Sequence, residues 1–167
     1  MKLSVIIPAY NEQATIYNIL KKVSSVELIQ GIEKELVVVN DCSKDDTEAE
    51  LQRFRNENPE IEINYQKHSV NRGKGAALHT GIHVSTGDFI IVQDADLEYD
   101  PREFNILLPP ILDGFADVVY GSRFVGGKPH RVLFFFHTIG NKFLTYLSNL
   151  LTNINLTDME TCYKLFK

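Results

Sequence analysis

The sequence has few cysteines, no long apolar run and no block of positive charge. Cys42 and Cys162 stand far apart without the spacing of a metal or redox motif, so we interpret them as reduced thiols of a cytoplasmic protein. No run of about 18 uninterrupted apolar residues is present to cross a membrane. A net charge of -5 without a basic cluster disfavours a nucleic-acid-binding role.

The chain does have a regular alternation of short apolar runs and helix-like segments. Its 167 residues, 44% of them hydrophobic, suffice for one domain with a sizeable core. The patterns predict strands at 3–9, 35–41, 61–66, 88–94 and 116–122. They predict helices at 11–25, 43–58, 73–85, 101–112 and 132–151. Strands that alternate with helices predict an α/β fold with a mostly parallel sheet.

Polar residues follow several of these strands, in "PAYNE", "NDCS", "QDAD" and "GSRF". In open parallel sheets, ligands bind outside the carboxyl ends of the strands. The sequence therefore predicts a ligand site at this edge of the sheet.

Asp94 and Asp96 stand two residues apart directly after an apolar strand. Two adjacent carboxylates repel and raise each other's pKa unless a cation joins them. Carboxylate oxygens with room for waters and phosphates suit Mg²⁺ or Mn²⁺. The alternative is that one aspartate caps the following turn and the other is solvated. The position at the end of a buried strand favours the metal.

Asp41 and the segment "NRGKGAAL" carry two further signals. An acid at the end of a second strand often binds a ribose or a base, although Asp41 could equally cap the next helix. Arg72, Gly73 and Lys74 lie at the start of a predicted helix, whose N-terminal N–H groups favour phosphate; the alternative is a glycine turn with solvated cations. The segment is not a Walker A loop, because no Ser or Thr follows Gly73-Lys74 and the preceding glycine is missing. It is not G-x-G-x-x-G either, because Leu78 replaces the third glycine.

Two features near the C-terminus leave alternatives open. Arg123 in "YGSRF" pairs either with a phosphate or with a structural carboxylate. The segment 132–151 carries one apolar helical stripe, which we interpret as a core helix. The alternative is a face that meets lipid or a hydrophobic acceptor. The stripe and its flanks are Val132, Phe134, Phe135, Phe136, Ile139, Phe143, Leu144, Leu147, Leu150 and Leu151.

The order of six motifs carries a family resemblance: "VIIPAYNE", "VVVNDCSKDDT", "NRGKGAAL", "QDADLEYDP", "YGSRF" and "DMETCYKLF". Together they resemble the family 2 glycosyltransferases of the GT-A fold, closest to the dolichyl-phosphate mannose or glucose synthase type. The resemblance covers essentially the whole chain. It implies a Rossmann-like three-layer sandwich and an inverting, metal-dependent hexosyltransferase that uses a UDP- or GDP-linked sugar.

The resemblance also implies roles for individual residues. Asp94 and Asp96 would hold Mg²⁺ or Mn²⁺, while Arg123 and Arg131 would lie near the acceptor or the phosphates. Asp158 would be the base for a hydroxyl acceptor, would only position an acceptor that is already anionic, or would cap a helix. The expected nucleotide-sugar contacts are Pro8, Ala9, Tyr10, Glu12, Asp41, Arg72, Gly73, Lys74, Asp94, Ala95 and Asp96.

The acceptor that the resemblance favours is a polyprenyl phosphate such as dolichyl or undecaprenyl phosphate. Transfer to a saccharide or protein hydroxyl is one alternative, and a donor-binding module without catalysis is another. Relatives normally continue beyond the position of "CYKLFK", and the Q-x-x-R-W pattern of processive relatives is absent. We therefore expect 1–167 to be a single catalytic domain that is truncated at its C-terminus. We expect it in the cytoplasm or at the cytoplasmic face of a membrane.

Overall fold

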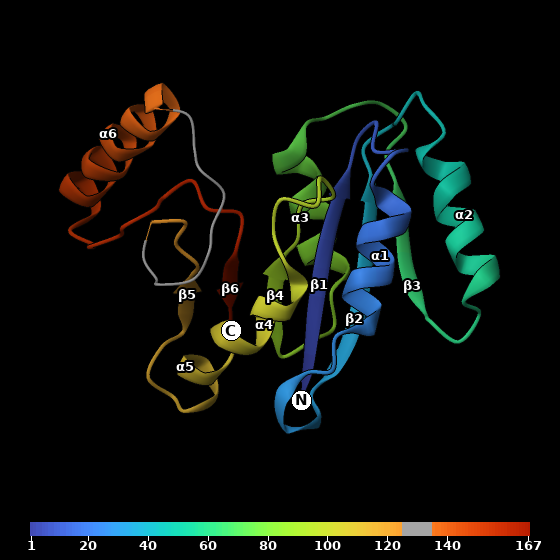
Figure 1. The fold of residues 1–167 in the computed structure, drawn as a ribbon, viewed down its shortest axis with the longest axis horizontal. Helices are drawn as coiled ribbons and strands as arrows, with labels where there is room; N and C mark the ends of the chain where they lie inside the picture. The colour runs from blue at the N-terminus through green and yellow to red at the C-terminus, as the bar shows by residue number, and fades with distance from the viewer. Residues whose placement is uncertain (125–134) are drawn as a thin grey trace.

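The computed structural model describes residues 1–124 and 135–167, which contain one six-stranded sheet (Figure 1). The strand order is β3-β2-β1-β4-β6-β5; β1 to β4 are parallel, and β6 is antiparallel to β4 and β5. The expected α/β fold with a mostly parallel sheet is confirmed, although the sequence analysis missed β6. The strands are β1 (Lys2–Ala9), β2 (Glu33–Asn40), β3 (Ile63–Lys67), β4 (Phe89–Val92), β5 (Val118–Tyr120) and β6 (Lys164–Phe166).

The helices follow the predicted order with corrections to their bounds. The helix expected at 43–58 begins only at Thr47. The helix expected at 11–25 begins only at Ile16, after a turn. The helix expected at 101–112 is broken into short pieces, since Pro109 and Pro110 cannot donate the backbone hydrogen bonds that a continuous helix requires. The helical elements are α1 (Ile16–Ser25), η1 (Ile29–Gly31), α2 (Thr47–Glu57), α3 (Lys74–Val84), η2 (Pro101–Glu103), α4 (Phe104–Leu107), α5 (Pro109–Leu112) and α6 (Phe135–Thr152).

Both faces of the central strands are covered, which gives three layers. Val5 and Ile7 of β1 belong to the larger core cluster, together with α1, α2 and α4. Ile6, which points the other way, packs in a second cluster with Ala77 of α3. In Figure 1, α1 and α2 lie in front of the sheet and α3 lies behind it. Burial on both faces explains why these strands are apolar at successive positions.

Helix α6 is the exception, because it buries polar residues and exposes apolar ones. Its buried residues are Asn141 and Thr145. Phe136 is 83% exposed and Phe143 63% exposed, and every described residue of the predicted stripe is exposed. The interpretation as a core helix is therefore wrong for these residues; Val132 and Phe134 lie outside the described ones.

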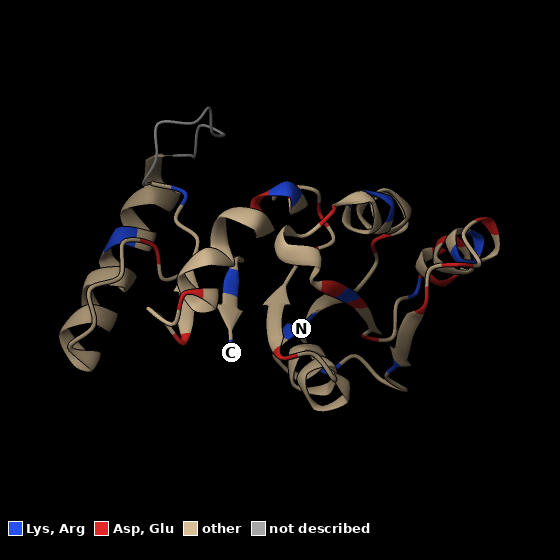
Figure 2. Cartoon of the chain, turned by 90° about the horizontal axis from the view of Figure 1, so that it is seen from below, with Lys and Arg blue, Asp and Glu red and all other residues tan. Residues whose placement is uncertain are grey.

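The surface of α6 also differs in charge from that of α2. Lys142 is its single Lys, Arg, Asp or Glu residue, whereas α2 at the opposite end carries charges of both signs (Figure 2). Among the helices of residues 1–124 and 135–167, none is long and apolar enough to cross a membrane.

Candidate functional site

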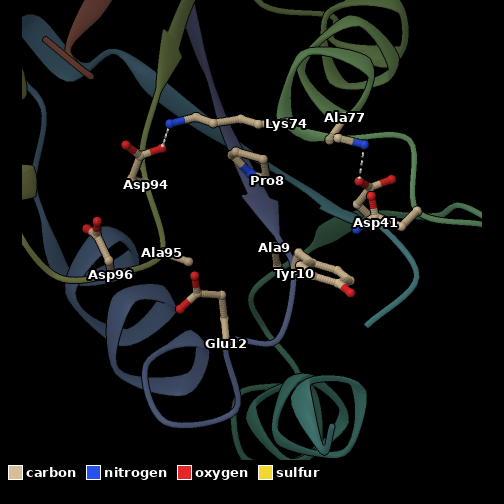
Figure 3. A pocket seen from close by; sticks show the side chains of 12 residues that line it. Pro8, Ala9, Tyr10, Glu12, Asp41, Lys74, Ala77, Asp94, Ala95 and Asp96 are labelled. Carbon is tan, nitrogen blue, oxygen red and sulfur yellow. Dashed lines mark hydrogen bonds and ion pairs between the residues drawn. The ribbon is translucent and has the colours of Figure 1, made fainter. Parts of the chain in front are cut away.

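A cavity of about 470 Å³ opens at the carboxyl ends of β1, β2 and β4 (Figure 3). Ten of the eleven residues expected to contact a nucleotide sugar line it, and only Arg72 is missing from the lining. Its walls are Pro8, Ala9, Tyr10, Glu12, Asp41, Asn71, Gly73, Lys74, Ala77, Asp94, Ala95 and Asp96.

The sheet register brings these segments together. Ala9 is paired with Asn40 across β1 and β2, so the chain leaves both strands at the same level. Beyond the last pairs, the Asp41 N–H donates to the Ala9 carbonyl at 2.9 Å, and the Gln93 N–H donates to the Ile6 carbonyl at 2.9 Å. Residues far apart in the sequence therefore line one cavity because parallel strands end at a common edge.

The loop after β1 is fixed by the segment before α2 and by the first residue of that helix. The Asn11 N–H donates to Ser43 Oγ at 3.1 Å, and the Glu12 N–H donates to Thr47 Oγ1 at 2.7 Å. The Glu12 carbonyl then accepts the first helical bond from the Ile16 N–H. These bonds explain why residues 11–15 form a turn rather than the first turns of α1.

Asp94 and Asp96 extend from the loop after β4 into the cavity, and Lys74 approaches from the start of α3 (Figure 3). Lys74 Nζ lies 2.5 Å from Asp94 Oδ1. Burial raises the pKa of the Asp96 carboxyl, and the charges of Asp94 and Glu98 raise it further. This carboxyl therefore lies where a cation would be favoured.

A divalent cation fits these two carboxylates only in part. Within the described residues, no group of three or more His, Cys, Asp or Glu side chains is placed to hold a metal ion. Mg²⁺ and Mn²⁺ often take one or two carboxylates from a protein and their other ligands from water or phosphate. Asp94 and Asp96 match that pattern, so a metal here would share its coordination with a bound phosphate.

Asp41 is buried and its carboxylate is occupied by donors from the chain itself. Oδ2 accepts from the Gly73 N–H at 2.7 Å, and the Arg72 N–H donates to both oxygens, at 3.0 and 3.1 Å. Oδ1 also lies 2.6 Å from Nδ1 of His68. Burial acts to raise the pKa of Asp41, but these donors hold it below its ordinary value. Asp41 therefore fixes the start of the glycine-rich segment.

Arg123 and Asp158 form a second polar centre, beside α6. Arg123 Nε and Nη2 contact the two carboxylate oxygens of Asp158 at 2.8 and 2.9 Å, and its backbone N–H donates to Oδ2 at 3.0 Å. Asn141 of α6 donates to Oδ1 at 2.8 Å. Burial opposes ionisation of Asp158, yet the Arg123 and Asn141 donors lower its pKa. Arg123 thus has a carboxylate partner, while Arg131 lies outside the described residues.

The comparison with protein families covers almost the whole chain: residues 4–167 match the model "Glycosyl transferase family 2". This chain belongs to glycosyl transferase family 2. A dolichol-phosphate mannosyltransferase of Pyrococcus furiosus is 34% identical to this glycosyltransferase chain over 129 residues, which are 77% of the chain and 35% of that relative. The chain thus spans about a third of the length of this curated relative.

Solved structures of glycosyltransferases share the fold. A mannosyltransferase of Pyrobaculum calidifontis, in complex with GDP-Man and Mn²⁺, is 29% identical with a TM-score of 0.54, and the match covers 60% of this chain and 29% of that one. Glucosyl-3-phosphoglycerate synthase of Mycobacterium tuberculosis is 23% identical with a TM-score of 0.72. That match covers 99% of this chain and 55% of the synthase, and supports the GT-A fold.

Sequence reasoning missed the partners that hold the site residues of this glycosyltransferase. His68 follows β3, and Asp41 follows the neighbouring strand β2, so the two strand ends place an acid and a histidine at one edge of the sheet. That signal was available. Asn141 and Thr145 sit in a helix whose apolar residues dominated the pattern, and only the structure shows that the polar residues face inward.

Proposed function

We propose that this chain transfers a sugar from a UDP- or GDP-linked donor to a polyprenyl phosphate, with inversion at the anomeric carbon. The cavity that joins Lys74, Asp94 and Asp96 to the start of α3 carries the proposal. The names of the relatives support the acceptor class: one is a dolichol-phosphate mannosyltransferase, and another is a bactoprenol glucosyl transferase homolog from Escherichia coli that is 34% identical.

The donor side of the site suits a nucleoside diphosphate. The N-terminus of α3 favours anions, and Lys74 there adds a positive charge. Asp94 and Asp96 would hold Mg²⁺ or Mn²⁺, which would neutralise charge on the departing diphosphate. Tyr10 and Glu12 line the part of the cavity formed by the first loop, where we place the nucleoside.

The acceptor side suits an oxygen that is already anionic. A general base must have a free oxygen, but the two Asp158 oxygens already accept bonds from Arg123 and Asn141. A phosphate acceptor needs no strong base, so Asp158 would position Arg123, whose guanidinium would attract the phosphate. A saccharide or protein hydroxyl as acceptor would require Asp158 to leave Arg123.

The first test is calorimetric titration of UDP and GDP, with and without Mn²⁺, into the wild type and Asp96→Ala. We expect manganese-dependent binding of one nucleotide, lost in the variant. Binding of neither nucleotide by the wild type would overturn the proposal. A chain that binds the nucleotide but transfers to neither polyprenyl phosphate nor saccharide would be a donor-binding module.

We also propose that α6 contacts lipid with its apolar face, at the cytoplasmic side of a membrane. Large apolar side chains with few charges suit the boundary between headgroups and acyl chains. Replacing Phe136 and Phe143 together by serine should weaken cosedimentation with phospholipid vesicles several-fold and leave nucleotide binding unchanged. The matched control is Phe115→Ser, at an exposed phenylalanine that lies between α5 and β5. Equal vesicle binding by all three proteins would contradict the lipid contact.

A further inference from the structure

His68 links the end of β3 to two other segments although no predicted role covers it. It follows the last residue of β3, is 8% exposed, and its backbone N–H continues the sheet by donating to the Asn40 carbonyl at 2.9 Å. Its ring Nδ1 lies 2.6 Å from Asp41 Oδ1, and Nε2 lies 2.8 Å from Thr80 Oγ1. The ring therefore bridges α3 and the residue that follows β2.

The proton on this ring can be assigned from its partners. Asp41 is ionised because its donors favour the charged form, and a carboxylate only accepts hydrogen bonds. Nδ1 must therefore carry a hydrogen and donate it to Asp41. The same carboxylate accepts the N–H groups of Arg72 and Gly73, so the ring fixes the acceptor that orders these two peptides.

At Gly73, the middle of the segment held in this way, no side chain is present to order the backbone. Gly73 has a φ of +84°, in the region that favours glycine, and it directly precedes the first turn of α3. The conformation of this peptide is therefore determined by the acceptor of its N–H group. That acceptor is Asp41 Oδ2, at 2.7 Å. Lys74 follows immediately and lines the cavity, so its backbone depends on the same bond.

The contacts also resemble an acid–histidine–hydroxyl relay for nucleophilic catalysis. Thr80 lies in the middle of α3, where its hydroxyl is partly buried. Asp41 already serves two peptide N–H groups rather than the ring alone. This arrangement suits the fixing of a loop better than the activation of a nucleophile.

We propose that His68 is a positioning residue of the donor site: through Asp41 it holds the Arg72–Gly73 peptides in the conformation that binds the nucleotide diphosphate. The inference rests on the proposed function for its ligand. The contact from Nδ1 to Asp41 carries this role, and the contact from Nε2 to Thr80 only orients the ring.

Two substitutions separate these contacts. The amide nitrogen of His68→Asn can take the place of Nδ1 and still donate to Asp41, whereas that of His68→Gln reaches the place of Nε2 and Thr80. Amide hydrogen exchange at Arg72 and Gly73 is measured by NMR on the ligand-free protein, and the Kd of UDP and GDP by calorimetry with Mn²⁺. His83→Asn, at an exposed histidine of α3, is the control.

We expect His68→Gln to speed exchange at both amides and to weaken nucleotide binding, each by about tenfold or more, because a hydrogen bond to a charged group is lost. His68→Asn should stay within about threefold of the wild type in both measurements. Equal losses in the two variants, or unchanged exchange in His68→Gln, would overturn the proposal. If the wild type binds neither nucleotide, the donor function fails while the exchange rates still decide the role of His68.

Discussion

At the residue scale, the Arg123–Asp158 pair shows how much a buried carboxylate depends on its partners. The side chain of Asp158 is 0% exposed and that of Arg123 is 28% exposed. Burying a charged group is favourable only when its hydrogen bonds are satisfied. The Asp158 carboxylate accepts three hydrogen bonds from Arg123 and one from Asn141. Removing the charge from one partner leaves the charge of the other buried without an opposite charge to compensate it.

The first prediction concerns Asp158→Asn, which keeps the shape and removes the charge. The free energy of unfolding at pH 7 should fall by about 3 kcal/mol. Because the donors from Arg123 and Asn141 hold the folded pKa of Asp158 below its ordinary value, the charge stabilises the fold above the unfolded pKa, and this stabilisation is lost as the pH falls through the folded pKa. Urea unfolding from pH 7 to pH 3 should therefore show the gap between wild type and variant narrowing only below about pH 4.

Asp100→Asn is the control for that experiment. Asp100 also pairs with an arginine, Arg102, but its side chain is 42% exposed. Exposed pairs contribute little, so this variant should lose less than about 1 kcal/mol. If the difference in unfolding free energy between the wild type and Asp158→Asn stayed constant down to pH 3, Asp158 would not be ionised in the folded protein as assigned.

The second prediction concerns Lys74, whose ammonium pairs with Asp94 and would compete there with a metal ion. Lys74→Met keeps the aliphatic stem and removes the charge. Calorimetry should show nucleotide diphosphate binding weakened about tenfold, as for the loss of one charged hydrogen bond. Binding of Mn²⁺ alone should be unchanged or tighter, because its competitor is gone. Weaker binding of Mn²⁺ by Lys74→Met would contradict competition between the ammonium and the metal. Lys21→Met on α1 is the control.

At the element scale, α3 lies so close to β1 that only glycine fits at one position. A Cβ added to Gly81 would lie 2.5 Å from Ile6 Cγ2, a distance that forces the core to shift. Gly140 in α6 also lies within a helix, but a Cβ there would meet nothing within 4 Å. The same substitution should therefore have opposite effects at the two sites.

The third prediction compares Gly81→Ala with Gly140→Ala. The first should destabilise the fold by about 1–3 kcal/mol through overpacking. The second should stabilise it by up to about 1 kcal/mol, since alanine is the better helix former. Urea unfolding measures both, and a stabilised Gly81→Ala would show that α3 can move away from β1 at little cost.

Helix α6 also shows where a sequence pattern stops being informative. The apolar stripe predicted a helix correctly, because helical periodicity is a property of the segment itself. The stripe did not show whether the apolar face of the helix packs against the core or stays exposed, since that depends on residues outside the segment. Asn141 and Thr145 face inward because Asp158 and the backbone of Met159 need their polar atoms.

At the scale of the whole molecule, the cavity couples ligand binding to stability. A ligand that binds only the folded chain raises its midpoint of thermal unfolding. The fourth prediction is that Mn²⁺ and the preferred nucleotide together, each at about 100 times its Kd, stabilise the wild type by roughly 5 kcal/mol. Asp94→Asn should lose most of this shift in a thermal unfolding assay. An equal shift in the variant would place the metal elsewhere.

The positions of the cavity residues could be predicted because parallel strands impose a common edge. Once β1, β2 and β4 were assigned, Tyr10, Asp41 and Asp94 had to lie together. The antiparallel β6 could not be predicted, because "KLF" is too short to show a period and its partners lie far away in the sequence. The ionic partner of Arg123 could not be predicted either, since sequence spacing does not determine contacts between distant segments.

The place of β6 in the sheet has a consequence for synthesis on the ribosome. Residues 164–166 form β6 and lie between β4 and β5, so these two strands have no hydrogen-bonded contact in the sheet until β6 joins them. A nascent chain can assemble β1 to β4 early, while β5 waits with its backbone groups unpaired. Closure of the sheet on this side must follow the emergence of Phe166 from the exit tunnel.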